Sequence, residues 1–138
     1  MSIFNGLQIN ASGLALERLK LDTVSTNIAN LNTNQTRNSA AYHAKSVVFS
    51  ENMKTSLNNG LTSSGVKVLG IDENLDRNLK YDPTNEVADA NGYVEQSNVN
   101  LSDEMVNMIQ AMRTYEANVS AQEANKSILT KALAISKN

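Results

Sequence analysis

Apolar side chains recur at seven-residue intervals near the start of the chain. The series comprises Leu7, Leu14, Leu21, Ile28 and, at a three-residue offset, Leu31. Residues seven apart lie on the same face of an α-helix, so the series is typical of the apolar stripe of an amphipathic helix. Asparagine and threonine, which favour turns over helix interiors, then dominate 30–34. The pattern predicts a helix over 5–31.

A longer stripe runs to the other end of the chain, in alternating steps of four and three residues. Its members are Leu101, Met105, Met108, Met112, Tyr115, Val119, Gln122, Lys126, Leu129, Leu133 and Ser136. Most of them are apolar, which is typical of a helix that packs on a partner helix in a coiled-coil-like way. Ser102 is predicted as the N-cap, with Asp103 and Glu104 in the positively poled first turn. The pattern predicts a helix over 103–135, roughly 50 Å long at 1.5 Å per residue.

The middle of the chain has a different pattern, with short β-favouring runs between turn signals. The runs are Ala44–Phe49, Val66–Ile71, Leu79–Tyr81 and Tyr93–Val99. Asn91-Gly92 and Asn59-Gly60 are turn signals, and Met53–Ser64 is predicted as a polar loop. We therefore predict a mainly α fold with a small β insert. Residues 1–34 and 101–138 form a discontinuous helical core, paired as a coiled-coil-like hairpin, and 35–100 form a loop-rich β insert.

Composition excludes several kinds of site. The net charge of −2 excludes a strongly basic nucleic-acid footprint. The absence of cysteine excludes disulfides and thiolate metal sites, and a single histidine, His43, excludes a multi-histidine zinc site. No nucleophile, base and orienting group can be assembled from the sequence. We therefore predict that the chain is not an enzyme and has no catalytic, cofactor-binding or metal-binding residues.

Three local motifs resemble functional sites and are better interpreted as structure. The series Asp72-x-Asn74-x-Asp76 resembles a calcium loop, but Arg77 and Pro83 replace its required Gly and Glu, which favours a polar turn. Gly60-x-x-x-x-Gly65 lacks the lysine of a phosphate loop, which favours a flexible loop. His43 has no acidic residue near it in sequence, which favours a surface or strand-edge position.

The surfaces of the two predicted helices indicate partners. Met105, Met108 and Met112 form a stripe that suits either ordinary core packing or an adaptable interface, because methionine fills irregular contacts. Part of the surface of each helix is polar but uncharged, at Thr23, Ser25, Thr26, Asn27, Asn30 and Asn32 in the first and at Ser120, Gln122 and Asn125 in the second. A solvated helix usually carries charges. Neutral faces suit helices with neighbours on several sides, where an unpaired charge would be costly.

The amino-terminal segment does not have the features of a secretory signal. It has no basic start, and Asn5, Gln8, Asn10 and Ser12 interrupt any apolar region. No stretch approaches the roughly 18 consecutive apolar residues of a membrane span. We therefore expect that the chain starts in the cytoplasm and that any export does not use a cleaved signal.

The segment Leu16–Thr33 is centred on Asn27-Ile28-Ala29-Asn30-x-x-Thr33. It resembles the amino-terminal signature that the axial rod and hook proteins of the bacterial flagellum share. Further stretches narrow the resemblance to proximal rod proteins; they are Val47–Phe49, Gly65–Val68, Tyr81–Pro83, Ala88–Val94, Asn98–Asn100, Glu104–Met108 and Tyr115–Val119. The resemblance covers nearly the whole chain and is weakest over Met53–Ser64.

The resemblance implies a structural subunit that is exported by the flagellar type III apparatus and assembles into the rod, the drive shaft of the basal body. Its implied partners are copies of itself, other proximal and distal rod proteins, the ring-rod adapter protein and the export apparatus, with no nucleic acid and no direct membrane insertion. The implied location is outside the cytoplasmic membrane, in the periplasm where an outer membrane exists. The alternative is a soluble helical adaptor or export chaperone that does not polymerise.

We predict that the two helices also carry the assembly interface, because a rod needs surfaces that fit different surfaces of the next subunit. The predicted interface residues are Leu7, Leu14, Leu21, Asn27, Ile28, Asn30, Leu31, Leu101, Met105, Met108, Met112, Tyr115, Val119, Leu129 and Leu133.

Overall fold

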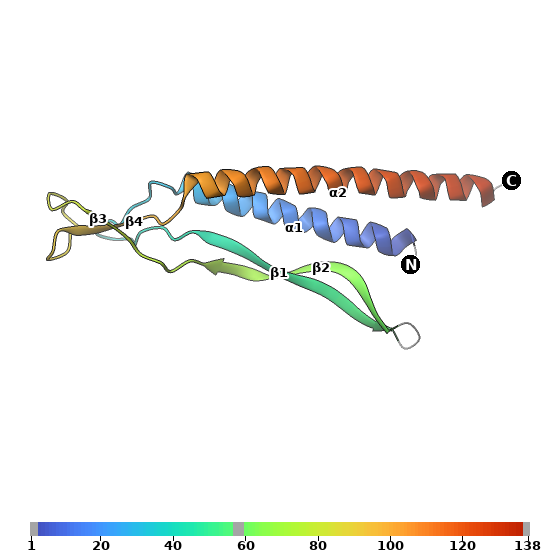
Figure 1. The fold of residues 1–138 in the computed structure, drawn as a ribbon, viewed down its shortest axis with the longest axis horizontal. Coiled ribbons are helices and arrows are strands. Elements are labelled where there is room, and N and C mark those ends of the chain that lie inside the picture. Colours follow the sequence, from blue (N-terminus) through green and yellow to red (C-terminus); the bar gives the residue numbers. More distant parts are fainter. Residues whose placement is uncertain (1–2, 57–59, 137–138) are drawn as a thin grey trace.

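The computed structural model describes residues 3–56 and 60–136 and is strongly elongated (Figure 1). Along the chain the elements are α1 (Ile3–Ala29), β1 (Lys45–Ser56), β2 (Gly60–Glu73), β3 (Asn78–Tyr81), β4 (Tyr93–Gln96) and α2 (Leu101–Ser136). α1 and α2 run antiparallel along the long axis, and the hairpin of β1 and β2 lies beside them. α1 contacts both α2 and this hairpin, so it forms the middle layer.

This architecture confirms the predicted fold class of two long helices around a small β insert. Both helices were predicted to within two residues at each end. The predicted cap of α2 was wrong, because the helix begins at Leu101, directly after Asn100. The Asn100 Oδ1 atom accepts a hydrogen bond from the backbone N–H of Ser102 at 3.0 Å. Asparagine caps helices as well as serine does, so the cap lies two residues earlier than predicted.

The hairpin of β1 and β2 is longer than the sequence indicated. The strands have 12 and 14 residues and pair antiparallel from Lys45 opposite Glu73 to Ser56 opposite Gly60. The prediction of a polar loop over Met53–Ser64 was therefore wrong for its described residues, as was that of a flexible loop at Gly60–Gly65. The strands were predicted from short apolar runs. A polar strand with one face in water has no such run, so the sequence pattern did not indicate it. The predicted Asn59-Gly60 turn lies partly outside the described residues.

A second, smaller hairpin joins β3 and β4 at the end of the molecule where α2 begins (Figure 1). The predicted turn at Asn91-Gly92 is present, and Gly92 has a φ of +82°, which favours glycine. It closes a loop over 82–92 that includes Pro83. Tyr81 in β3 and Tyr93 in β4 lie opposite each other next to this loop and pack edge to face, with their ring centroids 5.4 Å apart.

The segment that resembles a calcium loop forms the turn between β2 and β3, as predicted. Asn98, just before α2, stabilises this turn. Its Nδ2 atom donates hydrogen bonds to the carbonyl oxygens of Asn74 at 2.7 Å and Asp76 at 2.8 Å. The Asn98 Oδ1 atom accepts a bond from the Ala44 N–H at 2.7 Å. One asparagine thus connects the turn, the start of β1 and the approach to α2. Neither described helix is long and apolar enough to cross a membrane.

Gly65 lets β2 approach α1 closely, so we expect its substitution to destabilise the monomer. Its φ is +97°, and a Cβ atom there would clash with the hydroxyl of Ser12 and lie 3.2 Å from the Ile9 Cα atom. The Ser12 hydroxyl also accepts a hydrogen bond from the Val66 N–H at 3.1 Å. We expect Gly65→Ala to destabilise the monomer by about 1–3 kcal/mol in urea unfolding, because it adds backbone strain and a clash.

Gly70 is the matched control, since it lies in the same strand and a Cβ atom there would meet nothing within 4 Å. Gly70→Ala should change the free energy of unfolding by less than about 0.5 kcal/mol. Equal losses for the two variants would mean that the contact between α1 and β2 does not hold the hairpin.

Candidate functional site

The interface between α1 and α2 is built from small and polar residues. A Cβ atom on Gly6 would lie 3.4 Å from the Asn125 Nδ2 atom, and one on Gly13 would lie 3.0 Å from that of Asn118. Two seven-residue repeats further on, the amide of Asn27 lies beside the carboxyl group of Glu104 and lowers its pKa. Seven residues forward on α1 therefore match seven residues back on α2, as in an antiparallel coiled coil. The glycines let the asparagine amides pack against the α1 backbone.

Several predicted interface residues lie one position away from the residues at which α1 and α2 meet. On α1, Leu7 and Leu14 follow the contacting glycines directly and are half-buried. On α2 the buried positions are Glu104 and Ala111, whereas their predicted neighbours Met105 and Met112 are 52% and 48% exposed. The remaining predicted positions Leu21, Ile28, Leu31, Met108, Val119 and Leu129 are half-buried, and Tyr115 and Leu133 are exposed.

Asn27, in the middle of the family-like signature, is the most buried side chain of the site at 1% exposure. Its Nδ2 atom donates to the carbonyl oxygen of Lys45 at 2.8 Å. Its Oδ1 atom accepts from the Lys45 N–H at 3.0 Å and from the Tyr42 hydroxyl at 2.9 Å. The amide therefore pairs with Lys45 as a neighbouring strand would, and it joins α1, the start of β1 and α2 at one point.

The second half of the signature ends α1. The Asn30 Nδ2 atom donates to the Thr26 carbonyl oxygen at 2.9 Å, and the Thr33 hydroxyl donates to the Asn30 Oδ1 atom at 3.1 Å. The Thr26 carbonyl oxygen also accepts the backbone N–H of Asn30 at 3.1 Å, so the side chain adds a second bond to the one that ends the helix. Asn30 therefore stabilises the turn that leads the chain from α1 towards β1.

Glu104 carries a carboxylate that is almost out of solvent, at 9% exposure. Its Oε2 atom has no hydrogen-bond partner among the described residues. Burial raises the pKa of Glu104, and the nearby Asp103 raises it further, although the amide of Asn27 opposes both effects. The charged form of Glu104 is therefore disfavoured in the folded monomer.

The Glu104→Gln substitution should consequently stabilise the monomer at pH 7. A carboxyl group whose pKa is raised on folding costs stability as the pH rises through its ordinary and then its folded value, and costs nothing below both. We expect a higher melting temperature than for the unsubstituted chain at pH 7, and equal values near pH 4. A variant that melts lower at pH 7 would mean that the charged carboxylate stabilises the monomer.

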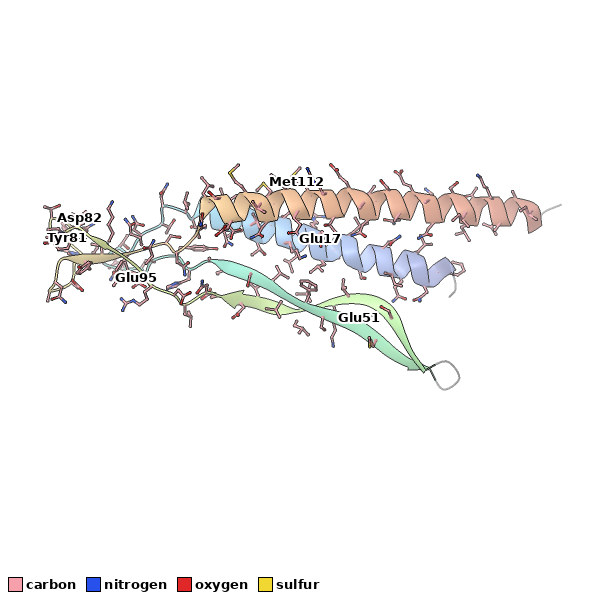
Figure 2. The ribbon with its side chains drawn as sticks, viewed as in Figure 1. Glu17, Glu51, Tyr81, Asp82, Glu95 and Met112 are labelled. Atoms are coloured by element: carbon pink, nitrogen blue, oxygen red, sulfur yellow. The ribbon has the colours of Figure 1, made fainter. Side chains whose placement is uncertain are left out.

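One flank of α2 exposes large apolar side chains and is called here the methionine flank, comprising Leu101, Met105 and Met112. The three residues recur at four- and seven-residue intervals, so they lie along one side of the helix. Figure 2 shows Met112 on the side of α2 that faces away from the hairpin of β1 and β2. In the described chain neither α1 nor the hairpin covers this flank.

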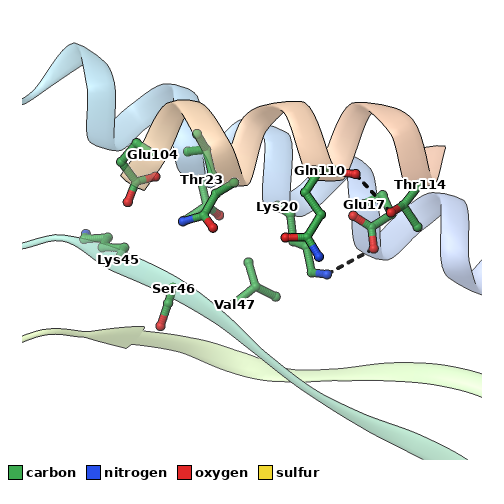
Figure 3. Close-up of a pocket in the computed structure, with 12 residues that line it drawn as sticks. Glu17, Lys20, Thr23, Lys45, Ser46, Val47, Glu104, Gln110 and Thr114 are labelled. Carbon is green, nitrogen blue, oxygen red and sulfur yellow. Dashed lines mark hydrogen bonds and ion pairs between the residues drawn. The ribbon is translucent and has the colours of Figure 1, made fainter. Parts of the chain in front are cut away.

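A groove lies on the opposite flank of α2. α2 and β1 form its walls and α1 forms its floor, around a cavity of about 210 Å³ (Figure 3). Its lining includes Glu17, Lys20, Lys45, Glu104, Gln110 and Thr114. Lys20 pairs with Glu17 at 3.0 Å, and Lys45 pairs with Glu73 at 3.1 Å.

His43 has a partner that its sequence neighbours did not indicate. Its Nε2 atom lies 4.0 Å from a carboxylate oxygen of Glu95 in β4, while Arg77 binds the same carboxylate through two nitrogen atoms at 3.1 and 3.0 Å. The paired guanidinium lowers the pKa of Glu95. This cluster holds β4 against the segment before β1. Within 3–56 and 60–136 no group of three or more histidine, aspartate or glutamate side chains could hold a metal ion.

Comparisons with known proteins agree with this arrangement of terminal helices. The model of the family "Flagella basal body rod protein" matches residues 7–34, and that of "Flagellar basal body rod FlgEFG protein C-terminal" matches 90–135. The flagellar basal-body rod protein FlgC of Bacillus subtilis is 38% identical to the chain, with 99% of this chain and all of the relative covered.

Two further relatives with the same description are similar over nearly their whole length. FlgC of Borreliella burgdorferi is 36% identical and FlgC of Salmonella typhimurium is 35% identical, with 98% of each sequence covered. The two matched regions contain most of α1 and α2, the elements that meet at Asn27 and Glu104. With this identity over its full length, the chain belongs to the FlgC family of flagellar basal-body rod proteins, the structural subunits of the basal-body rod.

Proposed function

We propose that the chain is a non-enzymatic subunit of the proximal rod, part of the drive shaft that transmits torque from the motor ring to the hook. The methionine flank is the observation that supports this most strongly. A 36-residue helix that one shorter helix covers on one side leaves a row of apolar side chains in water. Burying that row against other subunits supplies the free energy for assembly.

We further propose that residues 1–34 and 101–138 act together as the polymerisation domain and that 35–100 form an outer insert. The contacts of Gly6, Gly13 and Asn27 with α2 support this division, because they make one unit of the two terminal segments. The predicted interface residues on both helices remain our proposed assembly surface.

The partners proposed for this surface are copies of the chain, other proximal and distal rod proteins, and the ring-rod adapter protein. We also propose export by the flagellar export apparatus without a cleaved signal, and a location outside the cytoplasmic membrane, periplasmic where an outer membrane exists. We propose that nucleic acid is not a partner, which the net charge of −2 supports, and that the chain does not insert directly into a membrane.

Cysteine protection tests the proposal directly, because the chain contains no cysteine of its own. Met105→Cys and Met112→Cys should react with a maleimide in the purified monomer and become protected in isolated basal bodies. Thr84→Cys, in the exposed loop after β3, should react in both states. Recovery of the chain only from the cytosol, with Met105→Cys reactive throughout, would instead support a soluble adaptor.

A further inference from the structure

The methionine flank places two sulfur atoms where small molecules in water can reach them. Met105 is 52% exposed and Met112 is 48% exposed, and because they are seven residues apart they lie on the same side of α2. Met108 lies between them in the sequence and is half-buried. Figure 2 shows Met112 on the side of α2 that faces away from the hairpin of β1 and β2. The two thioethers of the flank are therefore more accessible than that of Met108.

Thioethers differ from the other apolar groups of the flank because a mild oxidant changes them. A peroxide transfers one oxygen atom to the sulfur: an S–O bond forms, the O–O bond of the peroxide breaks, and hydrogen peroxide leaves as water. The sulfur loses two electrons and the peroxide gains them. The product is a polar sulfoxide, whereas Leu101, the third member of the flank, has no atom that reacts in this way. Oxidation therefore makes an apolar flank partly polar.

We infer that Met105 and Met112 are oxidation sites that determine whether the subunit can assemble. A peroxide converts both to sulfoxides in the free subunit, and the oxidised flank no longer packs against a neighbour. This inference rests on the proposed function, in which the methionine flank is buried against other subunits. A polar group that leaves water without gaining a hydrogen bond opposes burial, and here two such groups lie in the same contact. Oxidation disrupts methionine-rich interfaces for this reason.

The free subunit is the reactive state, because burial protects the same sulfur atoms. In the proposed assembly a neighbour covers the flank, and an oxidant no longer reaches the thioethers. Oxidation then acts before incorporation, and rods that are already built stay intact. The step is reversible, because methionine sulfoxide reductases return the sulfoxide to the thioether. Reduction of an oxidised subunit therefore restores the apolar flank.

Peptide mass spectrometry of the purified monomer tests which methionines react. With hydrogen peroxide as the probe, Met105 and Met112 should be oxidised at least about twofold faster than Met108, because burial limits access to the sulfur. Met53 in β1 is 54% exposed and is the reference for an accessible methionine on another surface. In urea all four should react at the same rate. Equal rates for Met105 and Met108 in the folded monomer would overturn the selectivity for the flank.

Glutamine variants test the consequence for assembly without any oxidant, because glutamine is polar, uncharged and similar in length to methionine sulfoxide. The variant Met105→Gln with Met112→Gln should keep the circular dichroism of the unsubstituted monomer, since both positions are exposed. Its recovery in isolated basal bodies should fall at least about tenfold, as expected for buried polar groups without partners. Met53→Gln is the matched control and should be recovered like the unsubstituted chain. Equal losses for the two variants, or no loss for either, would overturn the inference.

A competition inside one cell tests oxidation itself. The leucine variant, Met105→Leu with Met112→Leu, keeps the flank apolar and has no sulfur there. It is expressed together with the unsubstituted chain, and hydrogen peroxide is added while rods are being built. Newly built basal bodies should then contain more of the leucine variant, relative to the unsubstituted chain, than those of untreated cells. An unchanged ratio, with sulfoxide detected in the unsubstituted copies outside the basal bodies, would overturn the inference.

The same competition separates this inference from the proposed function. Damage to other proteins affects both chains equally, so the ratio depends only on the two methionines. If both chains are present in an unchanged ratio, the rod function stands and the oxidation sites are wrong. Absence of both chains from basal bodies contradicts the proposed function, and the inference fails with it.

Discussion

The Met112→Asp substitution should abolish swimming while leaving the isolated monomer folded. In the monomer Met112 is half exposed and lies on the methionine flank, so an aspartate there is solvated and changes the free energy of unfolding by less than about 0.5 kcal/mol. In the assembly surface that we propose, the same position is buried against a neighbouring subunit. An unpaired buried carboxylate costs several kcal/mol even after relaxation, so assembly fails.

Two measurements separate assembly from folding and export. Circular dichroism of the purified variant should match that of the unsubstituted chain, and basal bodies from the variant strain should lack the rod beyond its first segment. We propose that the chain is exported unfolded, so the variant should still reach the export channel. Met112→Leu is the matched control, since it keeps the flank apolar, and its cells should swim. Normal swimming by Met112→Asp cells would remove the methionine flank from the assembly surface.

The Asn27→Ala substitution should have the largest effect on the monomer, about 2–4 kcal/mol of unfolding free energy. It leaves the N–H and carbonyl groups of Lys45 and the hydroxyl of Tyr42 without their present partner. Each buried polar group that loses its partner costs about 1–3 kcal/mol. A domain has a total stability of only about 5–15 kcal/mol, so the loss is a large part of it.

Urea unfolding of the monomer measures this loss, and Asn30→Ala is the control from the same signature. The hydrogen bonds of Asn30 are exposed, so water replaces them and the loss should stay near 0.5–1 kcal/mol, about the net value of one such bond. Similar losses for the two variants would mean that the strand-like pairing of Asn27 with Lys45 contributes little.

The sequence predicted the two helices because their apolar period extends over many turns. Leu7 to Ile28, and Leu101 to Leu133, each repeat the pattern often enough to outweigh local exceptions. The length of the β1–β2 hairpin could not be predicted in the same way. Met53–Ser64 contains polar residues that suit a loop equally well. Their conformation is decided by the antiparallel pairing of 53–56 with 60–63, which continues the pairing of the more apolar part of the two strands.

The candidate site was predicted only in part, for a physical reason. Apolar residues are the usual signal of a helix interface, but here Gly6 and Gly13 lie against Asn125 and Asn118. Their spacing of seven residues equals that of the leucines beside them, so periodicity alone cannot identify which row is inside. The small size of the glycines was the available signal. Whether the predicted residues form the assembly surface remains a prediction.

Contacts between distant segments were beyond prediction from sequence. The pairing of His43 with Glu95 and of Asn27 with Lys45 depends on how the insert folds back on α1. Neither pair has a characteristic spacing. The resemblance marked Asn27 as part of a signature, and only the fold explains why an asparagine is needed there.

The register of α1 on α2 also determines the order in which the chain can fold. The insert between the helices brings Asn27 and Glu104 together first, whereas Gly13 with Asn118 and Gly6 with Asn125 are separated by ever longer stretches of chain. Contacts between distant residues form slowly unless a shorter loop is already closed. The helices should therefore zip from the Asn27 end towards the termini. Substitutions at Asn27 then slow refolding, and those at Asn125 mainly speed unfolding.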